Sequence, residues 1–427
     1  MHVTHLWGLR RTRPPCGPAD AGLRLTAPRV WIRRGVFALR SHGRAAHRSI
    51  ILWDGRRICD PSETTAMAST HDGLRDRPTR RVWRSERNER SASSVATLVT
   101  KPRAAEFFAG MGLMRAGLDR CSVETVFAND VDDTKAAIYR DNWGSRELVV
   151  GDIRDLTGGD VPDVDLATAS APCVDFSLAG RRAGLNGNRS GVLYDFCRIL
   201  GEMGDRAPRT IMIENVPGLL TVHGGRDYRR VTTELRNLGY GTDCLCVDAA
   251  AFVPQSRRRI FIIGTRGWTP LLPPPPARRA TLRLYDIVSD DDEWWSPRRL
   301  EAFLDSLSPH QSRRVAEYRS RETVGYFGAF RRTRNGRAVW EVRADEIAGA
   351  LRTTRGGSAK QALLRAGCGE LAVRWMNVDE YARLQGAGDL RYESVSPHQA
   401  MFALGDAVCV PVIEWVGREC LLPLIAA

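Results

Sequence analysis

The 427-residue sequence lacks the features that mark membrane, metal-binding and disulfide-rich secreted proteins. It has no uninterrupted apolar run of the roughly 18 residues that a membrane-spanning helix needs, and charged residues interrupt its most apolar stretch, residues 408–427. Its ten cysteines are scattered, without a CxxC pair or a zinc-type spacing of Cys and His. Internal repeats are also lacking. We therefore expect no membrane span, no metal and no disulfide framework, and a reducing, cytoplasmic setting.

Positive charge is plentiful but unevenly distributed. The net charge is +13, and residues 1–100 account for most of it, with 19 Lys and Arg against 8 Asp and Glu. Because these residues show no sustained helical or strand period, they are predicted to form a disordered basic extension. Two alternatives are that the true start is Met67, with an over-extended reading frame upstream, and that the basic arm grips phosphates.

Apolar runs of strand length alternate with helical segments between residues 104 and 264. The expected strands cover 104–108, 123–128, 148–150, 164–169, 210–213, 242–247 and 260–264, and the expected helices cover 113–120, 132–142, 191–203 and 228–238. This alternation predicts an α/β fold with a parallel, doubly wound sheet.

The pattern changes after a proline-rich linker at residues 270–276. The segment that follows is rich in Arg with interleaved aromatic residues, which predicts a smaller inserted domain, and a helix is expected again at 376–384. The predicted organisation is the extension at 1–100, a catalytic and cofactor-binding domain at 101–268, the inserted domain at 269–345 and a C-terminal part at 346–427 that returns to the catalytic domain.

A glycine turn lies between the first expected strand and the first expected helix. It contains Phe108, Gly110 and Gly112, and its glycines let the backbone approach a ligand closely. Asp130 ends the second strand and Asp152 follows the third, so acids line the crevice where nucleoside ligands bind in open α/β sheets. The alternative is a tight turn with solvated acids. The full dinucleotide glycine pattern is missing, so NAD is not favoured.

Two further strands are followed by residues that carry chemistry. Cys173 follows the strand at 164–169, and Glu214 comes directly after the strand at 210–213. Catalytic groups belong at such strand ends. The alternatives are an inert buried cysteine and a solvated loop carboxylate.

The segment before the last expected strand is basic. Alternate residues of an extended segment share a face, so Gln255, Arg257 and Arg259 are expected to point together and Arg258 to point the other way. The alternative is a basic loop in an Arg-rich chain.

Taken in order, these motifs resemble those of the DNA (cytosine-5) methyltransferases. The resemblance covers roughly residues 104–265 and 345–420. Nine motifs in the family's order argue against a chance match. They are Phe108–Leu113, Asn129-Asp130, Gly151–Ile153, Pro172-Cys173, Arg189–Asp195, Glu214–Val216, Gln255–Arg259, Tyr381–Gly386 and Gly405–Val408.

The resemblance implies a Rossmann-like methyltransferase sheet with an inserted target-recognition domain. In this family a cysteine thiolate adds to carbon 6 of cytosine, which makes carbon 5 nucleophilic, and Cys173 matches that cysteine. Glu214 matches the glutamate that protonates ring nitrogen 3. Arg259, with Arg257 nearby, matches the arginine that contacts the cytosine carbonyl oxygen.

The cofactor that the resemblance implies is S-adenosylmethionine. Phe108 would stack near the adenine, and Gly110 and Gly112 would admit the methionine portion. Asp130 would bind the ribose, and Asp152 the adenine amino group. The other expected pocket residues are Ile153, Pro172, Val192, Asp406 and Ala407.

The sequence departs from the family pattern at Leu113, Val131, Val174 and Asp406. Asp406 stands where Asn is usual, and its added negative charge would favour the cofactor's sulfonium. These departures bear on cofactor affinity and leave Cys173, Glu214 and Arg259 in place.

The implied substrate is double-stranded DNA whose target cytosine is flipped out of the helix. The loop at 176–190 is expected to close over DNA; the alternative is a plain surface loop. The basic run at 331–334 is expected to face DNA, and the alternative is a solvated turn. The residues expected to contact DNA are Gln255, Arg181, Arg182, Arg189, Arg331, Arg332 and Arg334.

The implied function is that of the modification enzyme of a restriction–modification system, a monomer with a cognate restriction endonuclease as its functional partner. One alternative is methylation of a transfer RNA cytosine by the same machinery. Another is a catalytically silent DNA-binding protein, which would have lost the nucleophile or the acid, whereas Cys173 and Glu214 are both present.

Overall fold

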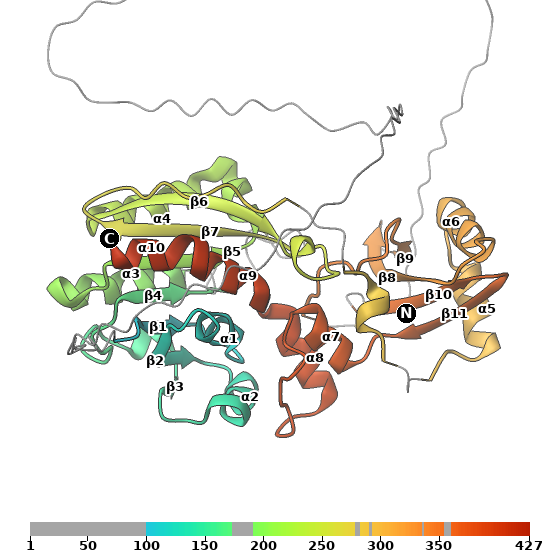
Figure 1. Cartoon of the computed structure of the whole chain (residues 1–427), viewed down its shortest axis with the longest axis horizontal. Coiled ribbons are helices and arrows are strands. Elements are labelled where there is room, and N and C mark those ends of the chain that lie inside the picture. The colour runs from blue at the N-terminus through green and yellow to red at the C-terminus, as the bar shows by residue number, and fades with distance from the viewer. Residues whose placement is uncertain (1–99, 173–190, 278–281, 290–292, 335–336, 354–359) are drawn as a thin grey trace, which may run out of the picture. The chain divides into compact units, whose positions relative to one another are not determined.

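The computed structural model describes residues 100–172, 191–277, 282–289, 293–334, 337–353 and 360–427 (Figure 1). At residues 333, 334 and 337 it describes the backbone alone. All of these residues belong to one compact unit, Ala92–Ala427. The expected extension at 1–100 lies outside the described residues except for its last residue.

A seven-stranded sheet has the strand order β3-β2-β1-β4-β5-β7-β6. Its strands are β1 (Arg103–Phe107), β2 (Glu124–Asp130), β3 (Leu148–Val150), β4 (Leu166–Ala169), β5 (Thr210–Asn215), β6 (Tyr240–Asp248) and β7 (Arg258–Arg266). All seven expected strands are present. Strands β1 to β5 pair in parallel, as the sequence predicts.

The last strand corrects the expectation of a wholly parallel sheet, because β7 runs antiparallel to both β5 and β6. Only residues 249–257 connect β6 to β7. A parallel pair needs a crossover of about a dozen residues or more, so this connection permits only a hairpin. The start of β7 therefore lies beside the end of β5.

Successive side chains of a strand point to opposite faces of the sheet. Both faces carry apolar side chains here, and helices cover both. Helices α3 and α4 pack with Phe107 of β1 on one face, and α1 and α9 pack with Ala104 on the other. This arrangement confirms the doubly wound α/β architecture. The helices are α1 (Leu113–Asp119), α2 (Asp133–Trp143), α3 (Val192–Met203), α4 (Arg226–Asn237) and α9 (Val410–Val416). Short 3-10 helices cover Ile153–Asp155, Gly204–Arg206, Pro217–Leu220, Val222–Gly225, Ala249–Ala251 and Leu284–Ile287.

A second, antiparallel sheet has the order β11-β10-β8-β9 and packs with α5 and α6. Its strands β10 and β11 come after residue 345, so the domain boundary expected at 345 falls inside this sheet, which ends at Trp375. Strand pairing over a long sequence distance leaves no local signal for such a boundary. The elements are α5 (Pro297–Asp305), α6 (Pro309–Arg319), β8 (Gly325–Arg334), β9 (Arg337–Val342), β10 (Gln361–Gly367) and β11 (Glu370–Trp375).

The chain then forms helices α7 (Val378–Leu384), α8 (Pro397–Asp406), α9 and α10 (Leu422–Ala426), with a π-helical turn at Gly417–Leu421. The helix expected at 376–384 is confirmed as α7, whose first turn is capped by Asn377 and Glu380. Glu380 also forms a buried, two-pronged ion pair with Arg374 of β11, at 2.6 and 2.8 Å. This pair ties the second sheet to α7.

One helical run among the described residues, Pro397–Ala426, is long and apolar enough by composition to cross a membrane. Of the apolar 18-residue window within this run, however, 61% is buried inside the protein. The apolar side chains of this run are therefore accounted for by the core.

Candidate active site

The carboxyl ends of the parallel strands meet at one edge of the seven-stranded sheet. Phe107, at the end of β1, pairs in register with Asn129 of β2 and with Ala169 of β4. Because β7 runs the opposite way, its first residues lie at the same edge, where Ile260 pairs with Asn215 of β5. The topology thus brings the predicted strand-end residues and the basic segment before β7 to one place.

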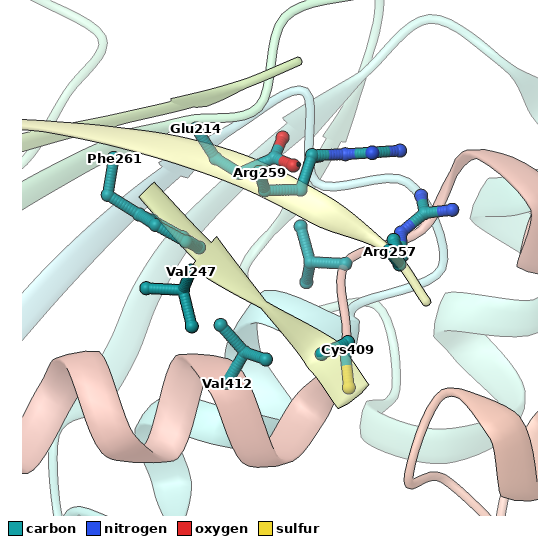
Figure 2. A pocket seen from close by; sticks show the side chains of 9 residues that line it. Glu214, Val247, Arg257, Arg259, Phe261, Cys409 and Val412 are labelled. Atoms are coloured by element: carbon teal, nitrogen blue, oxygen red, sulfur yellow. Dashed lines mark ion pairs between the residues drawn. The ribbon is translucent and has the colours of Figure 1, made fainter. Parts of the chain in front are cut away.

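Glu214 and Arg259 lie together at this edge, as Figure 2 shows. Arg259 Nε is 2.9 Å from Glu214 Oε1, and the side chains are 17% and 9% exposed, respectively. Burial raises the pKa of Glu214, and the charges of Arg259 and Arg257 oppose that rise. Because burial prevails, Glu214 holds a proton more readily than an exposed glutamate does.

A cysteine other than Cys173 lies close to the pair of Glu214 and Arg259. Cys409 lines the same pocket as Glu214 and Arg259, together with Val247, Phe261 and Val412 (Figure 2). Burial raises the pKa of the Cys409 thiol to about 12, so it stays protonated at neutral pH. Cys409 is therefore a packing residue and not a competing nucleophile.

Arg257 points into the protein and is 1% exposed. One terminal nitrogen, Nη1, donates a hydrogen bond to the carbonyl of Leu351 at 2.9 Å. The other, Nη2, donates to the carbonyl of Ala407 at 2.6 Å and, at longer distances, to those of Gly405 and Asp406. Arg257 thus holds two segments that are distant in sequence, while Arg259 faces Glu214.

Gln255 is fully buried next to Arg257. Its Nε2 donates to the carbonyl of Leu384 at 2.7 Å, and its Oε1 accepts from the amide of Leu351 at 3.0 Å. This placement does not present the side chain to DNA, where the sequence predicted it. Arg258 is exposed, whereas Gln255 and Arg257 are buried and Arg259 is 17% exposed.

The glycine turn after β1 has a left-handed backbone. The φ angles of Phe108, Gly110 and Gly112 are 58°, 58° and 82°. A Cβ on Gly112 would lie 2.5 Å from the ring of Trp143, so only glycine fits there without displacing its neighbours. The ring of Trp143 thus packs tightly against this turn at Gly112. Such a turn has no room for a side chain there, as expected of a backbone that a ligand approaches closely.

Asp130 fixes the turn in position. Its Oδ2 accepts from the amide of Gly110 at 2.7 Å, and its Oδ1 accepts from the amide of Asp132 at 2.8 Å. Burial raises the pKa of Asp130, against the opposing charge of Lys135 and these two hydrogen bonds. Asp130 therefore orders the turn directly, besides any contact with a ligand.

The pKa of Asp152 is shifted in the opposite direction to that of Asp130. Its carboxylate caps the short helix that begins at Ile153 and pairs with Arg154. Hydrogen bonds from the side chain and backbone of Arg154 lower the pKa of Asp152 to about 2. The lowered pKa favours the ionised form of Asp152, which accepts hydrogen bonds.

The remaining predicted cofactor residues lie around this edge. Ile153 is buried, Val192 begins α3, and Pro172 is exposed. Asp406 ends α8, next to Ala407, and its carboxylate lies 3.1 Å from Lys135 Nζ. The negative charge that distinguishes Asp406 is thus matched by a lysine, which the sequence interpretation missed.

Several predicted residues cannot be placed at the site. Cys173, Arg181, Arg182 and Arg189 lie outside the described residues, and only the backbone of Arg334 is described. Arg331 and Arg332 are exposed on β8. As successive strand residues they point to opposite faces, with Arg331 near the Trp340 ring and Arg332 near that of Phe330. They do not form one patch. Nowhere in the described part of the chain do three or more His, Cys, Asp or Glu side chains form a metal-binding group.

A family model described as C-5 cytosine-specific DNA methylase matches residues 103–422. The chain is 30% identical over 318 residues to the type II methyltransferase M.NlaX of Neisseria lactamica, covering 74% of this chain and 94% of that protein. It is 36% identical over 160 residues to the type II methyltransferase M.BsuFI of Bacillus subtilis, where the match covers 37% of this chain and only 38% of that protein.

Solved structures share the fold. The Dnmt2 methyltransferase of S. pombe superposes with a TM-score of 0.54 at 19% identity, covering 76% of this chain and 99% of that one. The methyltransferase EhMeth of Entamoeba histolytica superposes with a TM-score of 0.53 at 15% identity, covering 76% and 98%.

Proposed function

The chain belongs to the C-5 cytosine-specific DNA methylase family, and from that premise we propose that it methylates DNA cytosine through Cys173, Glu214 and Arg259. The activity that this membership supports is that of a DNA cytosine-5 methyltransferase, and its relatives are type II methyltransferases, the modification enzymes of restriction–modification systems. The observation that carries the catalytic assignment is the buried Glu214 held against Arg259 at the carboxyl edge of the sheet.

Carbon 5 of cytosine is a poor nucleophile until the ring is activated. In the proposed reaction the Cys173 thiolate bonds to carbon 6, while Glu214 supplies a proton to ring nitrogen 3. Arg259 donates hydrogen bonds to the carbonyl oxygen at carbon 2, where negative charge develops. Carbon 5 then accepts the methyl group, and its own proton passes to a water molecule as the carbon 5–carbon 6 double bond re-forms. Cys173 leaves as a thiolate, and ring nitrogen 3 returns its proton to Glu214.

The raised pKa of Glu214 supports its role as the acid. A carboxyl group whose pKa is raised holds a proton more readily and is better suited to donate it to the ring. Arg259 offers guanidinium N–H donors next to this carboxyl group, so the two side chains suit adjacent atoms of the pyrimidine. Cys173 itself lies outside the described residues, and its assignment rests on the motif and on its position just after Pro172.

The proposed methyl donor is S-adenosylmethionine, which when bound supplies an electrophilic methyl group. The residues present fit such a ligand, because the turn after β1 is left-handed at Phe108, Gly110 and Gly112, and Phe108 and Gly110 are only half-buried. Asp152 is ionised and suits the adenine amino group. Asp130 orders the turn on which the ribose would lie.

Target recognition is assigned to the second sheet with α5 and α6. Its exposed arginines Arg331 and Arg332 suit phosphates or guanine edges. Contacts from Arg181, Arg182, Arg189 and Arg334, flipping of the base, a monomeric and cytoplasmic state, and a cognate endonuclease remain predictions.

Bisulfite sequencing of plasmid DNA after expression tests the activity and reports the recognition site in one assay. Wild-type protein should protect cytosines in one sequence context, and Cys173→Ser should abolish this while sparing cofactor binding. A duplex with 5-fluorocytosine at the identified site should trap a covalent adduct, because fluorine blocks the elimination. Methylation by the Cys173→Ser protein would refute the assignment of Cys173 as the nucleophile. Methylation of transfer RNA but not of DNA would show that the substrate is RNA.

A further inference from the structure

The carboxyl end of α8, residues 405–407, is held from inside the protein and is called the α8 end here. Gln385 Nε2 donates to the carbonyl of Ala407 at 3.1 Å, and Arg257 Nη2 donates to the same carbonyl at 2.6 Å. Both donors are buried, so they fix the backbone of the α8 end. The side chain of Asp406, in contrast, is 45% exposed.

Lys135 lies in the first turn of α2, where Asp132 caps the helix. The Asp132 carboxylate accepts from the Lys135 amide at 3.1 Å, which fixes the lysine backbone. Long side chains on a helix point back toward its N-terminus, and this one reaches the glycine turn. A Cβ on Gly110 would lie 3.8 Å from Lys135 Cδ, which is an ordinary van der Waals distance. The lysine therefore packs against the turn that Asp130 orders.

The same lysine side chain also reaches the α8 end. Its Nζ lies 3.1 Å from Asp406 Oδ2, and the lysine side chain is 18% exposed. Burial lowers the pKa of Lys135, but the negative charges of Asp406 and Asp130 outweigh burial and raise that pKa above its ordinary value. One charged side chain thus touches the glycine turn and neutralises the acid of the α8 end, the two segments that are both predicted to hold the cofactor.

The charge of Asp406 matters because the proposed cofactor and its product differ in charge. S-adenosylmethionine has a positively charged sulfonium, and S-adenosylhomocysteine, which remains after methyl transfer, has an uncharged thioether. An unpaired carboxylate near the site would favour the cofactor over the product by Coulomb attraction. The sequence predicted this effect for Asp406, whereas an ion pair with Lys135 balances the negative charge.

We propose that Lys135 and Asp406 form a charge-balanced clasp across the cofactor site, which holds the α8 end against the glycine turn and keeps the site from distinguishing cofactor from product by charge. Both are positioning residues. The inference rests on the proposed function, because it takes S-adenosylmethionine as the methyl donor. It gives a role to Lys135, which belongs to none of the nine motifs, and it replaces the sulfonium-binding role predicted for Asp406.

The test is calorimetric titration of the full-length protein with S-adenosylmethionine and, separately, with S-adenosylhomocysteine. The ratio of the two dissociation constants is compared among wild type, Lys135→Met, Asp406→Asn and the double variant. Loss of a purely structural contact weakens both ligands alike and leaves the ratio unchanged, whereas an unbalanced charge changes the ratio. A unit charge acting over roughly 10 Å through a mostly aqueous surrounding changes it about two- to fourfold.

We expect Lys135→Met to shift the ratio by that factor in favour of the cofactor, because Asp406 is then unpaired, and Asp406→Asn to shift it in favour of the product. The double variant should return to the wild-type ratio, since the charges are balanced again.

The matched control is Asp141→Asn. Asp141 also lies on α2, and its Oδ2 accepts from the amide of Ser394 at 3.1 Å, so the variant removes a negative charge and a link from α2 to the C-terminal part without altering the clasp. Its ratio should equal that of wild type. Wild-type ratios in both Lys135→Met and Asp406→Asn would overturn the inference. Failure of the proposed function is a separate result, because bisulfite sequencing would then show no DNA methylation by the wild-type protein.

Discussion

Glu214 is subject to opposing influences, since burial favours its neutral form and Arg259 favours its charged form. The sequence predicted both residues, because a strand-end position and the alternation of an extended segment are local properties. It did not predict Lys135 or Arg352. Lys135 meets a partner 271 residues away, and the backbone beside Arg352 is held by Gln255 and Arg257, which are distant in sequence. It also grouped Arg331 with Arg332, which β8 directs to opposite faces.

Glu214→Gln should lower kcat by roughly 10² to 10⁴, because the amide cannot supply a proton to the ring. Since the protonated form is the active one and burial raises the pKa of Glu214, wild-type activity should fall as pH rises through the shifted pKa. The variant should lack this alkaline decline. Single-turnover rates from pH 6 to 9 measure both effects, with the half-exposed Glu202→Gln as control. An unchanged wild-type profile in Glu214→Gln would remove the acid from the mechanism.

Arg257→Met should lower the free energy of unfolding by about 3 kcal/mol, because buried carbonyls of Leu351 and Ala407 lose their charged donor. The neighbouring Arg258→Met is the matched control, since Arg258 is exposed, and should stay within about 0.5 kcal/mol of wild type. Urea denaturation followed by far-UV circular dichroism distinguishes the two variants. Equal effects would show that Arg257 contributes no more than a surface arginine.

Among the elements, the seven strands of the large sheet were predictable from apolar runs and intervening helices. The antiparallel course of β7 was missed because the direction of a strand depends on the length of its connection and on its pairing partner. The pairing of β10 and β11 with β8 was missed for the same reason, since no local pattern reports which strands meet.

Gly112→Ala tests the turn that joins β1 to α1. It combines a left-handed φ with a clash against Trp143, so we expect a loss of about 2–4 kcal/mol together with weaker cofactor binding. Gly239→Ala has a comparable φ of 87° with no atom within 4 Å, so it reports the backbone cost alone, about 1 kcal/mol. Thermal unfolding and calorimetric titration with S-adenosylmethionine give both quantities. Equal losses in the two variants would contradict the importance of close packing at Gly112.

Across the whole molecule, most of the net positive charge and the family match occupy different parts of the chain. Residues 1–100 hold most of the net positive charge, whereas the family match begins at residue 103. Deleting residues 1–66 should therefore leave site-specific methylation intact, as bisulfite sequencing with the full-length protein in parallel would show. Loss of methylation in the deletion variant would establish the basic arm as part of the enzyme.

The buried pair of Arg374 and Glu380 has a practical consequence for exchanging DNA specificity between relatives. A chimaera spliced at residue 345 would divide the antiparallel sheet and leave β10 and β11 behind with the recipient. The donor segment has to extend past Trp375 and carry both partners of the pair. Leu351 lies inside such a transplant, so the donor must also offer carbonyl and amide groups that the recipient's Gln255 and Arg257 can hold.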